Sequence, residues 1–357
     1  VVFFEHTALG LRVQGFDVSF ILINCTTAHL ATFLTTEKFI VHHLQVNRIL
    51  FSWRQIMQCA RILKSIKPNA VHSHMAVANW VGLWAARIAN VPMRVFTRHS
   101  GYPLYPTLKE TIVDKIQNKL ATHIVAITQN VSNLLQAQNV PAHKIILIHH
   151  GFDIARMMHP IPTEVAAIQQ KYNPTNNYPV IGVVARWIEL KGIQYIIPAF
   201  KQLLVDYPNA KLCLFNSNDS EGYGVELKKL CATIPTENIN CIGVEDNVYA
   251  LYKLCDVYVH VPINEGCEAF GQTYVEALAA GIPSVFTLSG VAPEFIRDKK
   301  NALVVGFKNS EDIYNAIKTI LTSPELKNEL IAQGQKDVIE KFSVQQYINK
   351  LATLYTH

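Results

Sequence analysis

The chain has 357 residues, half of which are apolar, and a formal net charge of +5 at pH 7. This length predicts two domains, each with its own core. The mild charge and the lack of a stretch that interleaves basic with aromatic residues argue against nucleic-acid binding; the charge fits either ordinary surface scatter or a preference for anionic substrates and membrane surfaces.

The first half of the chain alternates apolar runs of strand length with segments of helical spacing. Helices are expected at residues 1–11, 52–66, 77–89, 109–120 and 131–139. A turn and a buried strand are expected within residues 15–23, and further strands at residues 39–46, 70–74, 93–98, 123–127 and 144–148. Strands that alternate with helices in this way form parallel sheets, so we predict a doubly wound α/β domain over residues 1–153.

The second half repeats the alternation after a linker region, residues 154–178, which is rich in Pro, Asn and Gln near its end. Strands are expected at residues 180–185, 211–215, 239–242, 256–261, 284–286 and 302–305. Helices are expected at residues 193–207, 247–254, 272–281, 311–321, 325–341 and 343–355. These elements predict a second doubly wound domain over residues 179–341, followed by a last helical segment, 342–357.

Residues 268–283 present two carboxylates beside a predicted sheet edge. They follow an apolar run, residues 256–262, that indicates a buried strand, and their helix ends at Gly281. Glu268 then lies in the loop and Glu276 in the helix, at the carboxyl edge where α/β proteins bind ligands. The alternative is a loop acid and a helix acid that the helix dipole favours. The residue types also allow Glu268 to act as a general acid.

Arg186 and Lys191 follow the first strand of the second domain, in the segment Ala-Arg-Trp-Ile-Glu-Leu-Lys-Gly that ends at Gly192. A helix is predicted to begin directly after this segment. A helix amino end and two fixed cations together make a phosphate site. The alternative is a pair of ordinary surface cations.

His99 directly follows a predicted strand, so it should stand at the edge of the first sheet. A lone histidine is usually structural, but the position and context of His99 favour a functional role. His72 and His74 alternate on one strand face, but no third metal ligand suggests itself, and we predict no metal site. His149 and His150 lie near the domain boundary and receive no predicted role.

Glu268 and Glu276 enclose seven residues that include a Phe-Gly pair, and Glu276 begins the run Glu-Ala-Leu-Ala-Ala-Gly-Ile-Pro. This pattern resembles the E-x7-E motif of the retaining glycosyltransferases of the GT-B fold, family 4. The segment with Arg186 and Lys191 is similar to the family's G-R-x4-K-G segment, with Ala185 in place of the first Gly. The resemblance covers nearly the whole chain and is more specific in the second half.

The resemblance implies a GT-B fold, in which two doubly wound Rossmann-like domains face a cleft. It implies that helix 342–357 crosses back to pack on the first domain, whereas the pattern alone also allows it to complete the second. The family begins with a strand and a Gly-rich loop before its first helix. This chain begins without Met inside what looks like that helix, so we expect a truncated form whose domain 1–153 lacks its first strand.

The resemblance also implies roles for the candidate residues. Arg186 and Lys191 would stabilise the leaving diphosphate. Glu268 would contact hydroxyls of the donor sugar, Glu276 would hold the ribose hydroxyls, and His99 resembles a family histidine that approaches the donor sugar. The segment expected to face the donor consists of Ala269, Phe270, Gly271 and Gln272.

We therefore expect a retaining glycosyltransferase that moves a sugar from a UDP- or GDP-sugar to a saccharide or lipid-linked acceptor, without a resident cofactor. Negative charge grows on the leaving diphosphate, and either a metal or fixed cations must stabilise it. The chain has no Asp-x-Asp sequence, so we predict metal-independent transfer. The alternatives are a sugar-nucleotide epimerase or phosphorylase of related fold, and a catalytically silent nucleotide-sugar-binding protein.

Seven cysteines are scattered without a C-x-x-C pair, which indicates a reducing cytosol. No run of 18 apolar residues occurs, so no membrane span is expected. With the resemblance, these features predict a cytoplasmic protein, or one at the inner face of the cell membrane with peripheral membrane contact.

Overall fold

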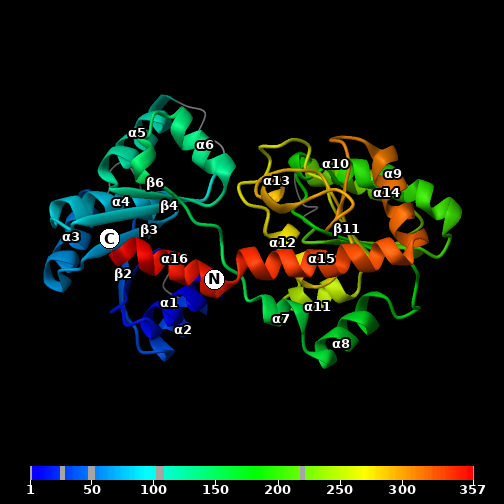
Figure 1. Ribbon diagram of the computed structural model, residues 1–357, viewed down its shortest axis with the longest axis horizontal. Coiled ribbons are helices and arrows are strands. Elements are labelled where there is room, and N and C mark those ends of the chain that lie inside the picture. The colour runs from blue at the N-terminus through cyan, green and yellow to red at the C-terminus, as the bar shows by residue number, and fades with distance from the viewer. Residues whose placement is uncertain (1, 25–28, 47–52, 102–107, 218–221, 357) are drawn as a thin grey trace. The chain divides into compact units, whose positions relative to one another are not determined.

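The structure is a computed structural model that describes residues 2–24, 29–46, 53–101, 108–217 and 222–356. The chain divides into two compact units. Unit 1 comprises Val1–Phe152 and Phe342–His357, and unit 2 comprises Asp153–Lys341. Each unit is a layered α/β assembly built on parallel strands (Figure 1), as the alternation of elements predicts.

Unit 1 contains two parallel sheets. The first pairs β1 (Ser19–Ile23) with β2 (Ile40–Leu44), and the second has the order β3-β4-β5-β6. The strands of the second sheet are Ala70–His74, Met93–Arg98, His123–Ala126 and Ile145–Leu147. All predicted strands of this half are therefore present, and within the described ranges β1 and β3 belong to different sheets.

The helices of unit 1 before the C-terminal segment are α1 (Val2–Val13), α2 (His29–Thr36), α3 (Trp53–Ile66), α4 (Ala76–Ile88), α5 (Leu108–Leu120) and α6 (Gln129–Ala137). The sequence did not predict α2, which is short and rich in Thr. Leu34 is fully buried in a cluster with Ala8 and Phe39, so tertiary packing stabilises a helix that local propensity does not favour.

The C-terminal helix α16 (Val344–Thr356) packs on unit 1, which confirms the predicted crossing (Figure 1). Leu351 and Ile348 of α16 share a buried cluster with Leu11 of α1 and Val95 of β4. Gly10 permits this contact, because a Cβ there would lie 2.1 Å from the Ile348 side chain. The helix thus covers the sheet face toward which Val95 points.

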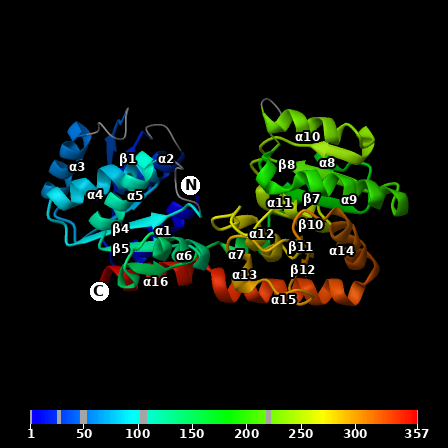
Figure 2. The same ribbon diagram turned by 90° about the horizontal axis from the view of Figure 1, so that it is seen from above.

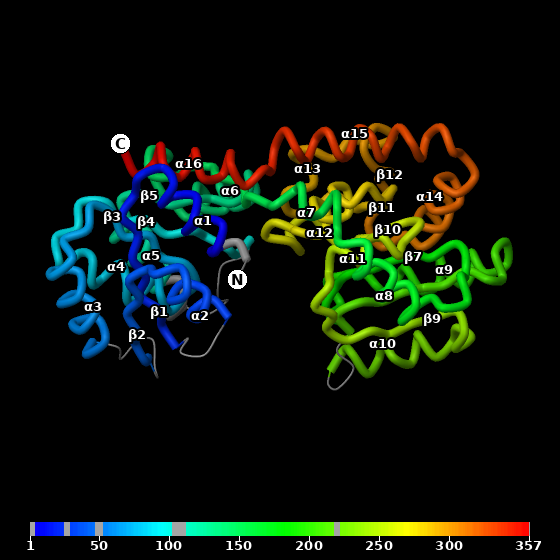
Figure 3. The backbone as a smooth tube through the Cα atoms, turned by 90° about the horizontal axis from the view of Figure 1, so that it is seen from below, coloured from blue at the N-terminus to red at the C-terminus, as the bar shows by residue number. Residues whose placement is uncertain are grey.

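Unit 2 is built on one six-stranded parallel sheet in the order β12-β11-β10-β7-β8-β9 (Figures 2 and 3). In chain order, β7 to β12 are Val180–Val184, Lys211–Phe215, Ile239–Cys241, Val257–His260, Ser284–Phe286 and Leu303–Val304. The strands after β7 add on one side and the strands after β10 add on the other. The direction of winding therefore reverses between β7 and β10, which makes this point a topological switch.

Helices α9 (Ile193–Asp206), α10 (Tyr223–Cys231), α11 (Val248–Lys253), α12 (Gln272–Ala279), α13 (Ala292–Phe295), α14 (Ser310–Thr322) and α15 (Pro324–Phe342) complete the elements after β7. Segment 154–178, which the sequence presents as a linker, carries α7 (Ile154–Met158) and α8 (Pro162–Tyr172) and clusters with unit 2. Burial of Met157 and Ile168 explains why this segment is helical.

Candidate active site

The loops after β7 and β10 meet at the switch point of unit 2. The Ile263 N–H donates to the Leu190 carbonyl at 3.1 Å. Gly192 has φ +75°, and a Cβ on it would lie 1.9 Å from the Val261 carbonyl oxygen. Only glycine allows so close an approach in this conformation. Ligands of open α/β sheets bind at such a point, outside the carboxyl ends of the strands.

Glu268 is the centre of the polar contacts between the two loops. Its Oε1 accepts from Lys191 Nζ at 2.5 Å and lies 2.9 Å from His260 Nε2. Its backbone N–H donates to the Ser289 hydroxyl at 3.0 Å. Glu268 is 8% exposed and His260 is 2% exposed. The sequence assigned separate ligands to Lys191 and Glu268, whereas the structure pairs them.

Glu268 is held in its ionised form. Burial alone would raise its pKa, but the hydrogen bond and charge of His260 and the charge of Lys191 outweigh burial and lower the pKa to about 2. Lys191 and His260 both contact Oε1 of its carboxylate. Oε2 has no protein partner within the described structure, so it is the oxygen that can accept a ligand hydroxyl.

Glu276, the second acid of the motif, has a different environment. It lies on α12, is half-buried, and its Oε2 accepts from the Tyr252 hydroxyl at 2.7 Å. Burial raises its pKa, and the hydrogen bond from Tyr252 only partly offsets this. The two glutamates of the motif therefore differ: Glu268 is ionised, whereas Glu276 has a raised pKa.

The remaining candidates of unit 2 surround these acids. The Arg186 side chain is exposed and has no hydrogen bond or ion pair within the part of the chain that the structure describes. Gly271 has φ +85° and caps α12, which begins at the exposed Gln272. Phe270 is buried, and its carbonyl accepts from the Val291 N–H, while Ala269 is half-buried. Arg186 and the amino end of α12 therefore stay available to an anionic ligand.

His99 lies in unit 1, where it belongs to a row of four imidazoles that sequence reasoning did not connect. Its Nε2 is 3.1 Å from His74 Nδ1, and its ring stacks on His150 with centroids 5.4 Å apart. His72 stacks on His74 at 4.4 Å and lies 2.8 Å from the Thr97 hydroxyl. Burial lowers the pKa of His99 to about 4 and, with its histidine neighbours, those of His72 and His150 to about 3.

The described residues offer neither a metal site nor a membrane-spanning helix. No three His, Cys, Asp or Glu side chains there are grouped so that they could hold a metal ion. No described helix combines the length and apolar character that a membrane crossing requires. Metal-independent chemistry stays a prediction that activity measurements must test.

Two family models together match most of the chain. The model of Glycosyltransferase Family 4 matches residues 1–156, and that of Glycosyl transferases group 1 matches residues 164–337. The chain belongs to the family 4 glycosyltransferases. It is a transferase with the GT-B fold, as the sequence predicts.

This glycosyltransferase has relatives and structural neighbours along most of its length. It is 25% identical over 325 residues to the capsular polysaccharide biosynthesis glycosyltransferase CapM of Staphylococcus aureus, covering 88% of this chain and 84% of the relative. It is 24% identical over 319 residues to the alpha-monoglucosyldiacylglycerol synthase of Acholeplasma laidlawii, covering 84% and 78%.

Among solved structures, a glycosyltransferase from Rickettsia africae has a TM-score of 0.84 at 21% identity, covering 99% of this chain and 93% of that one. Anabaena HepE in complex with UDP-glucose has a TM-score of 0.83 at 19% identity, covering 99% and 95%. These likenesses show the fold.

Sequence reasoning missed two residues of the glycosyltransferase's site, His260 and Tyr252. A histidine inside the apolar strand β10 was a signal that could have identified His260, because a buried imidazole needs a polar partner. Tyr252 carries no such signal, since nothing local connects α11 with Glu276.

Proposed function

We propose that this glycosyltransferase moves a sugar from a nucleotide diphosphate donor to a saccharide or lipid-linked acceptor, with retention of configuration and without a metal. The observation that carries the proposal is the ionised Glu268, fixed by Lys191 and His260 at the switch point of unit 2. Retention rests on the resemblance of the E-x7-E motif to that of retaining enzymes.

The cations supply what the leaving group needs. Cleavage of the bond between the anomeric carbon and the phosphate oxygen places negative charge on the diphosphate. Lys191 Nζ has three N–H donors and directs one of them to Glu268, so two can serve the diphosphate. The exposed Arg186 adds a second cation. Each fixed donor of this kind contributes about 2.7–4 kcal/mol of transition-state stabilisation, which favours a metal-independent reaction without a resident cofactor.

The acids supply recognition of hydroxyl groups. Glu268 Oε2 would accept from the donor sugar, and Glu276 from the ribose, each with about 1.5–3 kcal/mol. A UDP- or GDP-sugar is the proposed donor, and UDP-glucose in the solved complex of the structural neighbour HepE supports this class. His99 is proposed to approach the donor sugar from unit 1 as a neutral hydrogen-bonding group.

The proposed place of action is the cytoplasmic face of a membrane. The names of two relatives, a capsular polysaccharide glycosyltransferase and a glucosyldiacylglycerol synthase, support a glycan or lipid acceptor. Such acceptors are used at membranes, which favours a protein with peripheral membrane contact and a role in surface polysaccharide or glycolipid synthesis.

Thermal unfolding in the presence of UDP-, GDP-, ADP- and CMP-sugars tests the donor class. A donor at 100 times its Kd should add about 2.7 kcal/mol of stability. Incubation of the selected donor with and without saccharide acceptors then tests turnover. An epimerised product formed without acceptor would indicate an epimerase, and binding without any product would indicate a silent binding protein; either result overturns the proposal.

A further inference from the structure

The charge of this protein is divided unevenly between its two units. Unit 1 holds 15 Lys and Arg against five Asp and Glu, a net charge of +10, whereas unit 2 carries −5. No acid occurs between Glu37 and Glu110, while ten Lys and Arg lie in that stretch. The overall charge is mild because the acidic unit 2 partly offsets a strongly basic unit 1.

The outer face of α3 belongs to this acid-free stretch. Ile56, Cys59, Ala60 and Leu63 of α3 are buried against unit 1. Its outer face exposes Trp53, Arg54, Arg61 and Lys64, and 61% of the Trp53 surface is accessible. In the described structure none of the three cations has a hydrogen bond or an ion pair. An exposed tryptophan beside unpaired cations is typical of a membrane-interface helix.

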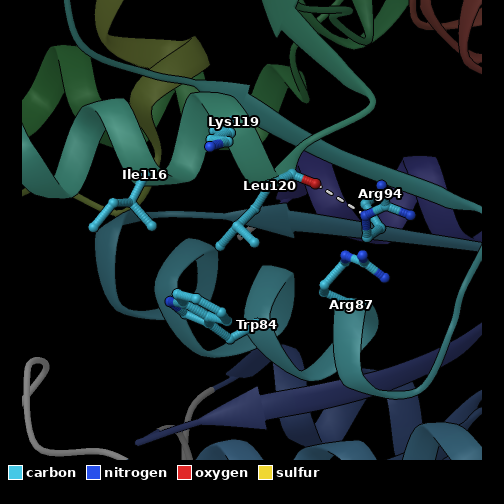
Figure 4. Close-up of a pocket in the computed structure, with 6 residues that line it drawn as sticks. All are labelled: Trp84, Arg87, Arg94, Ile116, Lys119 and Leu120. Carbon is cyan, nitrogen blue, oxygen red and sulfur yellow. Dashed lines mark hydrogen bonds between the residues drawn. The ribbon is translucent and has the colours of Figure 1, made fainter.

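A cavity of about 380 Å³ lies farther along the same row of helices, between α4, α5 and the start of β4. Helices α3 and α4 pack together, as do α4 and α5. Trp84, Ile116 and Leu120 give the cavity an apolar lining, and Arg87, Arg94 and Lys119 are its other lining residues (Figure 4).

Side-chain hydrogen bonds hold only one of the three cations that line this cavity. Arg94 donates to the Leu120 and Val91 carbonyls at 2.9 and 2.8 Å. Arg87 and Lys119 are exposed, and no polar partner occurs for either side chain among the described residues. Burial and the nearby charge of Arg87 lower the pKa of Arg94, so the cations repel one another. An anion between them would relieve this repulsion.

Helix dipoles account for only part of the pattern. Arg87 and Lys119 lie in last helical turns, where a cation is favourable. Arg54, in contrast, is the second residue of α3, where the helix dipole disfavours a cation. The exposed Trp53 and Ile66 of α3 add apolar surface beside these cations.

We propose that the outer surface of α3, α4 and α5 docks on a bilayer that contains anionic phospholipid. Trp53 enters the interface, Arg54 and Arg61 contact lipid phosphates, and the cavity beside Arg87 receives a further headgroup. This proposal rests on the proposed use of a membrane-borne acceptor. Vesicle binding is measured without donor or acceptor, so the docking proposal can fail independently of the proposed function.

Sedimentation of the full chain with vesicles tests the surface. The chain should bind vesicles of phosphatidylcholine with phosphatidylglycerol, release at high salt, and bind phosphatidylcholine alone only weakly. The double substitution Arg54→Glu, Arg61→Glu should lower partitioning by more than about tenfold, since each basic residue near an anionic surface contributes about fivefold. Trp53 emission should shift to the blue on binding, and Trp53→Phe should lose most of that shift.

The matched control is Lys201→Glu, Lys336→Glu, which makes the same change in net charge on exposed helix positions of unit 2. It should bind anionic vesicles as the unmodified chain does. Equal losses in both double variants, or equal binding to neutral and anionic vesicles, would overturn the proposal. Circular dichroism of all variants verifies that each is folded.

Discussion

The Nε2 atom of His260 lies 2.9 Å from the Oε1 atom of Glu268. Tyr274 packs edge-on against the His260 ring, with centroids 4.8 Å apart, so the imidazole is held in place. Glu268 is ionised and can only accept, which means that Nε2 carries the hydrogen. His260 and Lys191 together orient Glu268 so that Oε2 remains for a ligand.

Replacing His260 with Leu should lower kcat/KM for the sugar donor by about 10- to 100-fold, because a hydrogen bond to a charged group contributes about 1.5–3 kcal/mol. His260→Gln keeps a side-chain N–H and should retain most of the activity. Inhibition by the nucleoside diphosphate product should stay unchanged in both variants. Leu and Gln variants with the same kinetics would contradict a role through the hydrogen bond.

Removing the charge of Lys191 should slow the transfer of the sugar. Lys191→Met is expected to reduce kcat by about 10²- to 10³-fold, as the loss of one electrostatic donor does. Lys201 is exposed on α9, so Lys201→Met serves as the control and should leave kcat unchanged.

Activity of the unmodified enzyme should persist in excess EDTA. Complete loss in EDTA that Mg²⁺ or Mn²⁺ restores would show that the cations do not act alone.

The two acids should respond differently to substitution and to pH. Glu276→Ala should raise the donor KM, and Glu268→Ala should mainly depress kcat.

Since burial raises the pKa of Glu276, donor KM should rise on acidification before Glu268 is protonated. Tyr252→Phe removes the hydrogen bond that lowers the Glu276 pKa, so it should move this rise to higher pH. If the donor KM of the unmodified enzyme and that of Tyr252→Phe depend on pH in the same way, the assignment of Glu276 is refuted.

Close approach at Gly192 should make it intolerant of any side chain. Gly192→Ala adds a Cβ 1.9 Å from the Val261 carbonyl oxygen, as well as the roughly 1–2 kcal/mol cost of a left-handed L residue. Gly15 has φ +85° but nothing within 4 Å of its Cβ position, so Gly15→Ala reports the backbone cost alone. Urea unfolding should show a distinctly larger loss for Gly192→Ala, and equal losses would exclude the steric explanation.

The histidine row of unit 1 should make its stability depend on pH. His72, His99 and His150 have folded-state pKa values of about 3 to 4, below the ordinary value of 6.5. Between pH 3 and pH 6.5 the unfolded chain therefore binds more protons than the folded chain. The stability that these neutral histidines contribute is complete above about pH 6.5 and is lost as the pH falls toward 3. Each such histidine contributes about 1.4 kcal/mol per pH unit.

Urea unfolding between pH 7 and pH 5 measures this dependence. His150→Gln should reduce its slope, whereas substitution of the exposed His143 by Gln should not. A stability that is constant over this range would mean that the imidazoles are not held neutral by the fold.

Local sequence determined the type and order of most elements. Strands β3 and β4 occupy the predicted residues 70–74 and 93–98, and α12 begins at the predicted Gln272. Apolar periodicity and helix-ending glycines and prolines act over a few residues, so they can be read without the fold. The spacing of Glu268 and Glu276 was visible for the same reason.

Only the tertiary structure decided which partners these side chains have. Lys191 and Glu268 are 77 residues apart in the chain, and they meet because the sheet places the ends of β7 and β10 side by side. The same parallel pairing brings His74 to His99 in unit 1. Strand order arises from long-range packing, and burial and neighbouring charge then set the ionisation of each group, so neither can be inferred from residue type and spacing.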